Sequence, residues 1–281
     1  MPAGKPTVAD YHVHTPYCGH AQGKIVEYVD AAIAAGIPEI GFSDHLGRYY
    51  LTKSQKRRYW DWGMNERNLG RYLSELSDVS ETYDGRIGLR AGLEVDFIEG
   101  AEDLLTPIME LYPVDYLLAS IHCIPSLGWK HIAHYTKRDS WPVYEEYFRL
   151  ARAAIESGLF DSLAHMDFIW RYVKWPAGKG EEVFKLIDRT VEGAARADVA
   201  VEINSNGYLW SQLYKVDEGD PFDALVRSVV EHGAHITIGS DAHKPEFVGK
   251  AFDSVVPALK DRGVAKYSVF AERKRREKAI P

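Results

Sequence analysis

Seven short apolar segments, each followed by a stretch of helical periodicity, constrain the fold of this chain more than any other feature. The segments span 8–13, 39–43, 87–94, 116–121, 161–165, 199–203 and 235–238. Between them, apolar residues recur at spacings of three and four, as in Ile25, Tyr28 and Val29, which is typical of helices. Strands that alternate with helices run parallel, because each helix returns the chain to the same end of the sheet. We therefore predict an α/β fold with a parallel sheet.

Helix caps and chain length favour one barrel domain. The first helical stripe stops at Gly36, and the stripe from Phe222 to Val230 follows Asp220-Pro221 and stops at Gly233, all typical cap residues. Further stripes lie at 69–79, 144–155 and 183–191. About 200 to 250 residues build one barrel of this kind, and no break interrupts the alternation. We predict a single domain over residues 1–281, closed or nearly closed into a barrel.

Charge and composition point to a small-molecule partner. The net charge of −7 and the pI near 5.9 oppose binding to nucleic acid or to an anionic membrane. Cys18 and Cys123 are too few for a disulfide framework and favour a reducing compartment. No run reaches the roughly 18 apolar residues of a membrane span, so we expect a cytoplasmic protein; the sequence predicts no oligomeric state. The basic run 273–276 is expected to be a solvated helix face.

Histidine and acidic side chains recur at the carboxyl ends of the predicted strands. His12 and His14 are two residues apart, so they face the same side of their strand. The further candidates are Asp44, His45, Glu94, His122, His165, Asp241 and His243. The carboxyl ends of barrel strands meet at one face, and imidazole and carboxylate are the ligands that divalent transition metals prefer. The sequence therefore predicts a site for more than one metal ion.

These residues, taken in order, resemble the PHP (polymerase and histidinol phosphatase) superfamily. The resemblance rests on His12-x-His14, His20, Asp44-His45, Gly92-Leu93-Glu94-Val95-Asp96, His122, His165 and Asp241-x-His243, and it spans nearly the whole chain. It implies a distorted (β/α)7 TIM-like barrel, the PHP fold, with two to three divalent ions of zinc, iron or manganese. The ligands that it implies are His12, His14, His20, His45, Glu94, His122, His165, Asp241 and His243.

The resemblance also distributes these ligands among three metals. The first would be held by His12, His14, Glu94 and Asp241, the second by Glu94 as a bridge with His122 and His165, and the third by His20, His45 and His243. In such a site a bridging hydroxide attacks phosphorus while the metals neutralise the phosphate charge. Glu94, Asp241 and His243 are the expected catalytic residues, and the leaving group takes its proton from Asp241, His243 or a metal-bound water.

Two further segments are similar to the histidinol phosphatase branch of the superfamily. They are Gly92 to Phe97 and Glu156 to Asp167. This similarity implies hydrolysis of L-histidinol phosphate to L-histidinol and phosphate, a reaction of histidine biosynthesis. The segment from Cys123 to Ser140 departs from that branch and is expected to line the pocket. A nucleotide, oligonucleotide or sugar phosphate is the alternative substrate.

Charged residues beside the ligands are candidates for binding substrate and for supporting the ligands. Arg171, Lys174 and Lys244 are candidates for holding phosphate. Asp44, Asp96 and Asp167 are candidates for orienting imidazoles, and Asp96, Asp167 and Glu246 for receiving a cationic tail. His131 and His134 are candidate substrate contacts, whereas His232, His235 and Cys123 are expected to be structural and Cys18 is given no role.

Two other classes of protein share part of this pattern. Metal amidohydrolases also begin with His-x-His and end with an aspartate, but they typically hold two metals bridged by a carboxylated lysine. Here Glu94 stands where a bridge is needed, and His20, His45 and His243 supply a third site. A non-catalytic metal scaffold would not need so full a ligand set. Hydrolysis of phosphate esters against a panel of amides separates these alternatives.

Overall fold

Seven parallel strands lie side by side in the order in which they follow one another along the chain. The computed structural model describes residues 8–46, 50–58, 63–135, 140–214 and 216–281. The strands are β1 (Asp10–Val13), β2 (Glu39–His45), β3 (Gly88–Asp96), β4 (Tyr116–Ser120), β7 (Ser162–Leu163), β8 (Ala200–Asn204) and β9 (Ile236–Gly239). Every neighbouring pair is parallel. The predicted parallel α/β sheet is confirmed, and each predicted strand overlaps an observed one.

The two ends of this sheet meet and nearly close it into a barrel. Val13 forms a parallel bridge with Ala242, just beyond β9, and the His14 N–H donates to the Ala242 carbonyl oxygen at 2.9 Å. The buried Asp10 carboxylate accepts from the Ser240 N–H at 2.9 Å and from the Ser240 hydroxyl at 2.5 Å. The barrel is distorted, because β7 has only two residues and the pairing of β1 with β2 shifts register.

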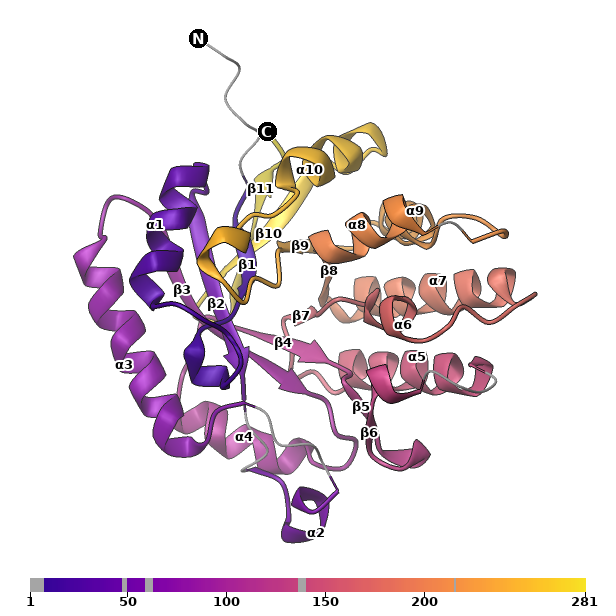
Figure 1. The fold of residues 1–281 in the computed structure, drawn as a ribbon, viewed down its shortest axis with the longest axis horizontal. Coiled ribbons are helices and arrows are strands. Elements are labelled where there is room, and N and C mark those ends of the chain that lie inside the picture. The colour runs from indigo at the N-terminus through magenta and orange to yellow at the C-terminus, as the bar shows by residue number, and fades with distance from the viewer. Residues whose placement is uncertain (1–7, 47–49, 59–62, 136–139, 215) are drawn as a thin grey trace.

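Most of the helices surround the strands, whereas α2 lies apart from them beyond α4, as Figure 1 shows. The helices of the described residues follow in chain order. They are α1 (Ile25–Ala35), α2 (Lys53–Lys56), α3 (Glu66–Thr82), α4 (Glu102–Leu111), α5 (Trp141–Glu156), α6 (Phe168–Tyr172), α7 (Gly180–Ala197), α8 (Ser205–Leu213), α9 (Pro221–His232) and α10 (Phe252–Asp261). Short 3₁₀ turns are η1 (Pro16–Cys18), η3 (Pro125–Leu127), η4 (Ile132–His134) and η5 (Pro245–Phe247), and β5 (Cys123–Ile124) pairs with β6 (Lys130–His131).

The predicted helix caps form, with one departure in the apolar stripe of α9. Gly36 and Gly233 end α1 and α9 with φ of 75° and 62°, the left-handed conformation that glycine adopts without strain. The Asp220 side chain accepts from the Phe222 N–H at 2.9 Å. Val230 is 44% exposed and does not belong to the buried stripe, because its side chain points away from the barrel near the end of α9.

Tyr116, at the start of β4, fills the interior of the barrel on the amino-end side of the predicted metal ligands. A side chain at Gly92 would place its Cβ 2.3 Å from the Tyr116 ring, and one at Gly41 would meet the Tyr116 hydroxyl at 2.5 Å. The Tyr116 hydroxyl donates to the Tyr11 carbonyl oxygen at 3.0 Å. The two glycines therefore leave room for a bulky ring that packs the interior.

The basic run 273–276 lies in a β-hairpin, so the prediction of a helix face is wrong. β10 (Lys266–Ala271) pairs with β11 (Lys274–Ala279), and φ values of 50° and 61° at Glu272 and Arg273 fit a type I′ turn. Acidic residues next to the amino ends of barrel strands bind the run. Arg273 pairs with Asp161 at 2.5 Å and Arg275 with Asp198 at 2.6 Å. The hairpin therefore lies across the amino ends of the strands.

No helix in the described part of the chain is long and apolar enough to cross a membrane.

Candidate metal centre

The nine predicted ligands come from six barrel strands or the loops that follow them, and the structure brings them together. His12 lies on β1 and His14 follows it, His45 ends β2, and Glu94 lies near the end of β3. His122, His165, Asp241 and His243 lie in the first residues after β4, β7 and β9, and His20 lies in the loop beyond η1. These side chains meet at the carboxyl end of the barrel, opposite the β10–β11 hairpin.

Glu94 stands at the centre of this group. Its Oε2 atom lies 3.2 Å from His12 Nε2 and 3.1 Å from His45 Nδ1. Its Oε1 atom lies 2.8 Å from His165 Nε2 and 3.4 Å from His122 Nε2. The two oxygens of one buried carboxylate therefore face different imidazoles, His12 and His45 on one side and His165 and His122 on the other, which is the arrangement that a bridging ligand requires.

Asp241 extends the set on the Oε2 side. Its Oδ1 atom lies 3.3 Å from His14 Nε2 and 3.7 Å from His12 Nε2. The backbone of Asp241 has φ of 53°, a left-handed conformation that is uncommon for a residue other than glycine. Potential ligand atoms of His12, His14 and Asp241 lie within 4.8 Å of one another, as do those of His12, Glu94 and His165.

His20 and His243 present two ring nitrogens to each other. The Nδ1 atom of His243 lies 3.0 Å from the Asp241 carbonyl oxygen, and that of His20 lies 3.3 Å from the Cys18 carbonyl oxygen. Because a carbonyl only accepts, each Nδ1 carries a hydrogen, and the neutral ring then has a lone pair on Nε2. These two Nε2 atoms lie 2.8 Å apart, so a cation between or beside them would satisfy both. Potential ligand atoms of His20, His45 and His243 lie within 4.8 Å of one another.

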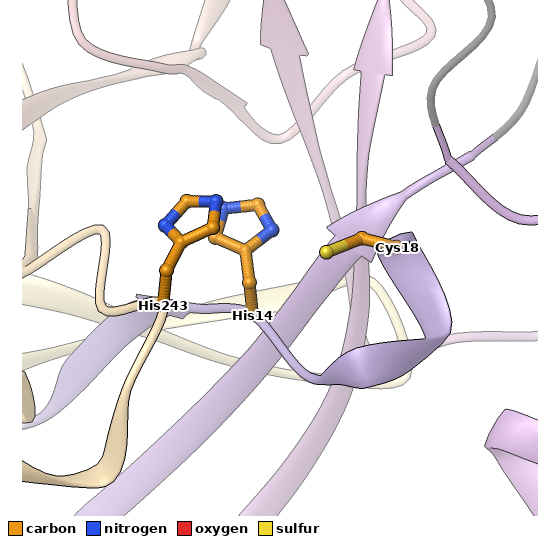
Figure 2. Close-up of side chains that lie close together, drawn as sticks. All are labelled: His14, Cys18 and His243. Carbon is orange, nitrogen blue, oxygen red and sulfur yellow. The ribbon is translucent and has the colours of Figure 1, made fainter. Parts of the chain in front are cut away.

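His14 gives a further test of whether a metal fits. The side chain is fully buried, and among the described residues neither of its ring nitrogens makes a hydrogen bond of good geometry, although Nε2 lies 3.3 Å from Asp241 Oδ1 and 3.4 Å from Glu94 Oε2. Figure 2 shows the His14 ring between His243 and the thiol of Cys18, and potential ligand atoms of these three residues lie within 4.8 Å of one another. A buried imidazole without hydrogen bonds is costly, and coordination of Nε2 by a metal would remove much of that cost.

Two of the predicted supporting carboxylates lie behind ligand imidazoles. Asp96 Oδ1 lies 3.0 Å from His122 Nδ1 and accepts from the His122 N–H at 2.9 Å. Asp44 Oδ1 lies 3.8 Å from His14 Nδ1, and Asp44 accepts from both the backbone N–H and the hydroxyl of Thr15. Asp96 orients one ligand ring directly, whereas Asp44 chiefly fixes the turn that follows His14.

Glu202 also contacts a ligand, and sequence reasoning did not single it out. This carboxylate on β8 is 1% exposed, and its Oε1 atom lies 2.8 Å from His12 Nδ1. The available signal was an acidic residue inside the apolar strand segment 199–203, where a charge is costly unless it is paired.

Opposing charges hold the central groups in their ionised forms. Burial alone raises the pKa of Glu94, but the imidazoles of His45, His12, His122 and His165 outweigh it and hold the pKa well below its usual range. Burial lowers the pKa of His12, yet the carboxylates of Glu202, Glu94 and Asp241 raise it well above its usual value. Without a metal, the centre therefore pairs an ionised Glu94 with a protonated His12.

The predicted phosphate-binding residues differ in their surroundings. Arg171 on α6 is largely buried, pairs with Asp167 at 3.1 Å and lies over the Phe168 ring. The Phe168 ring in turn lies 4.8 Å from the His122 ring and 4.9 Å from the His165 ring, centroid to centroid, which places Arg171 near the ligand cluster. Burial lowers the pKa of Arg171, but the carboxylates of Asp167 and Asp241 raise it above its usual value. Lys174 is exposed and Lys244 half-buried, and neither forms an ion pair within the described ranges.

His131 lies against the ligands, whereas His134 lies farther out. The His131 ring stacks parallel to His122, with centroids 6.0 Å apart, and meets Phe168 edge-on at 5.7 Å. His134 is exposed and touches the edge of His131. The predicted pocket segment Cys123 to Ser140 thus reaches the centre through His131, while residues 136–139 lie outside the described residues.

The three residues expected to be structural have partners outside the ligand set. His232 pairs with Asp188 at 2.9 Å and His235 with Glu277 at 2.8 Å. Cys123 is buried in a small apolar cluster with Leu51, Ile98 and Ala101.

Comparisons with known proteins agree with this arrangement. The PHP domain matches residues 10–206. A probable histidinol-phosphatase of Deinococcus radiodurans is 32% identical over 91% of this chain and 94% of its own length. The histidinol-phosphatase of Bacillus subtilis is 25% identical over 87% and 97%. A crystal structure of histidinol phosphate phosphatase from Lactococcus lactis, complexed with zinc, L-histidinol and phosphate, has the same fold, with a TM-score of 0.79 at 21% identity over 96% and 100%. This chain therefore belongs to the PHP domain family.

Proposed function

We propose that this protein is a metal-dependent phosphomonoesterase that hydrolyses L-histidinol phosphate to L-histidinol and phosphate in histidine biosynthesis. One observation carries the proposal: five imidazoles face the two oxygens of the buried Glu94. Arg171 adds a cation beside this cluster, because it lies over the Phe168 ring, which contacts His122 and His165. Relatives named histidinol-phosphatase that match most of the chain support the choice of substrate. Both cysteines are free, as in a reducing compartment, and we place the activity in the cytoplasm.

The ligand geometry supports three metal ions. His12, His14 and Asp241 would hold the first, His122 and His165 the second, with Glu94 shared between them, and His20, His45 and His243 the third. When bound, divalent ions neutralise the charge of the phosphate and lower the pKa of water near the reacting phosphorus. Zinc, iron and manganese all accept this mixture of nitrogen and oxygen ligands.

The protein's own groups would hold the phosphate and the leaving group. Arg171 supplies a planar cation that matches phosphate oxygens, and Asp167 fixes its direction. The Asp241 side chain is 13% exposed and that of His243 is 29% exposed. Both therefore line the open side of the cluster, where the phosphate and its leaving group would lie.

The contacts of Asp96, Asp167 and His131 decide which residues we propose to bind the part of the substrate beyond the phosphate. Asp96 is engaged with His122, and Asp167 with Arg171, so we propose both as supports for those partners. His131 is the candidate for contact with the substrate, because it stacks on a ligand imidazole and lies beside Phe168. Glu246 is exposed on η5, three residues after His243, and remains the candidate partner of a cationic tail.

A panel of substrates tests the proposal. Protein loaded with zinc, manganese or iron should hydrolyse histidinol phosphate with a higher kcat/KM than nucleoside monophosphates, sugar phosphates or p-nitrophenyl phosphate. Buried polar groups left unmet by the wrong substrate each cost about 1 to 3 kcal/mol, so the preference should exceed tenfold. A higher kcat/KM on a nucleotide or sugar phosphate would refute the substrate. Activity on amides alone would refute the phosphatase.

A further inference from the structure

Glu202 is a buried carboxylate inside the barrel that is not among the nine predicted metal ligands. Glu202 lies on β8, between β7 and β9 in the sheet, and is 1% exposed. It reaches two predicted metal ligands that belong to different strands and to different metal sets.

Each oxygen of Glu202 has a separate partner. Oε1 lies 2.8 Å from His12 Nδ1 and also accepts from the Asn204 side-chain amide at 3.3 Å. Oε2 accepts from the backbone N–H of His165 at 2.5 Å. An ionised carboxylate only accepts hydrogen bonds, so all three partners must donate to it.

This contact determines which nitrogen His12 offers to a metal. Because Nδ1–H donates to Glu202, the lone pair of the neutral ring is on Nε2. That atom lies 3.2 Å from Glu94 Oε2 and 3.7 Å from Asp241 Oδ1, on the side where the first metal would bind. A carboxylate behind a ligand imidazole fixes the tautomer and ring orientation and raises the basicity of the ligand.

The neighbouring strand leaves space for the contact. A side chain at Gly239 on β9 would place its Cβ 2.0 Å from Glu202 Oε1 and 2.5 Å from His12 Cβ. Any residue larger than glycine would therefore collide with both members of the pair. His12 on β1 and Glu202 on β8 therefore form this hydrogen bond, and Gly239 on β9 leaves the space for it.

We propose that Glu202 is a positioning residue that couples the first two metal sets, by fixing the His12 ring and anchoring the His165 backbone. The inference rests on the proposed metal-dependent function and adds a residue to it. Glu202 is not a catalytic residue, because His12 and Glu94 stand between it and the site of reaction. Its effect should therefore appear first in metal binding.

Glu202→Gln is the sharpest variant, because an amide of the same shape cannot serve both partners. If its oxygen faces His12, its NH₂ group opposes the His165 N–H; if it is turned round, the NH₂ group opposes His12 Nδ1–H. The zinc Kd of the first metal set should rise about 10- to 100-fold. The apoprotein is titrated with Zn²⁺ against a chromophoric chelator, and Glu231→Gln, an exposed residue on α9, is the matched control. Glu202→Asp keeps the charge but is too short for both partners, and should recover only part of the affinity.

A second measurement on the wild type guards against a variant that does not fold. Long-range ¹H–¹⁵N spectra of the zinc-loaded protein should show His12 protonated at Nδ1 and metal-bound through Nε2. An Nε2-protonated His12 would overturn the inference, and so would wild-type zinc affinity in Glu202→Gln. If the wild type binds zinc and hydrolyses phosphate esters while the variant is unchanged, only the role of Glu202 fails. If the wild type binds no zinc, manganese or iron, the proposed function fails with it.

Discussion

Glu94→Gln removes the negative charge that five imidazoles surround and should abolish most of the activity without unfolding the protein. The glutamine keeps the shape of the side chain, but its NH₂ group cannot ligate a metal, so one of the two sets facing Oε1 and Oε2 loses an oxygen. A unit charge at 4 Å contributes about 4 kcal/mol at an effective dielectric constant of about 20. If that loss falls on the transition state, kcat/KM drops about 10³-fold, at 1.36 kcal/mol for each factor of ten.

The assay combines three readouts on one preparation. Steady-state hydrolysis of histidinol phosphate gives kcat/KM, elemental analysis gives the metal content, and circular dichroism reports the fold. Glu99→Gln is the matched control, since Glu99 is an exposed residue just after β3 that pairs with Arg149 at 2.8 Å. It should leave all three readouts unchanged. A Glu94→Gln protein with more than a tenth of the wild-type kcat/KM and a full metal content would show that the carboxylate does not bridge.

Two further outcomes follow from the contacts around His12. Gly239→Ala should destabilise the protein by about 1 to 3 kcal/mol, because its Cβ would overlap Glu202 and His12. Thermal unfolding measures this loss. Gly193→Ala on α7 is the control and should not lower Tm, because nothing lies within 4 Å of the added Cβ. Zinc binding should release protons at neutral pH, because neighbouring carboxylates raise the pKa of metal-free His12 well above its usual value and a ligand nitrogen must be unprotonated. The zinc affinity should therefore fall as pH decreases from 8 to 6; calorimetric enthalpies that do not depend on the ionisation enthalpy of the buffer would contradict this.

Most of the barrel was predictable, because its strands are buried on both faces. Such strands appear as short apolar runs bounded by turn residues, and the predicted segments 8–13 and 199–203 overlap β1 and β8. The β10–β11 hairpin was missed because its second strand is mostly charged and exposed. The ion pairs that join it to the barrel involve Asp161 and Asp198, which lie far away in sequence.

The site was predictable to the extent that its residues carry a recognisable type and spacing. The residues from His12 to His243 could be assembled because strand ends of a parallel barrel converge. Glu202 was not predicted, because its role depends on a hydrogen bond to Nδ1 of His12 on another strand. The local sequence spacing gives no indication of that contact. Likewise, Asp96 and Asp167 were recognised as neighbours of ligands, but their partners His122 and Arg171 emerge only from the fold.

The seam, where β1 meets the residues around the end of β9 and closes the barrel, should form late in folding, and the metal centre forms with it. Asp10 and Ser240, which join the seam, are 230 positions apart, and His12, His14, Asp241 and His243 lie beside them. Contacts of such long range are slow to form, because the chain must lose the entropy of a very large loop before they contribute. A partly folded chain, with all its other strands paired, still lacks Asp241 beside His12, His14 and Glu94 in the first ligand set. An ion that binds His14 and Asp241 together would stabilise the closed barrel, because it binds both sides of the seam. The supply of metal would then influence how much of the newly made protein reaches the closed form.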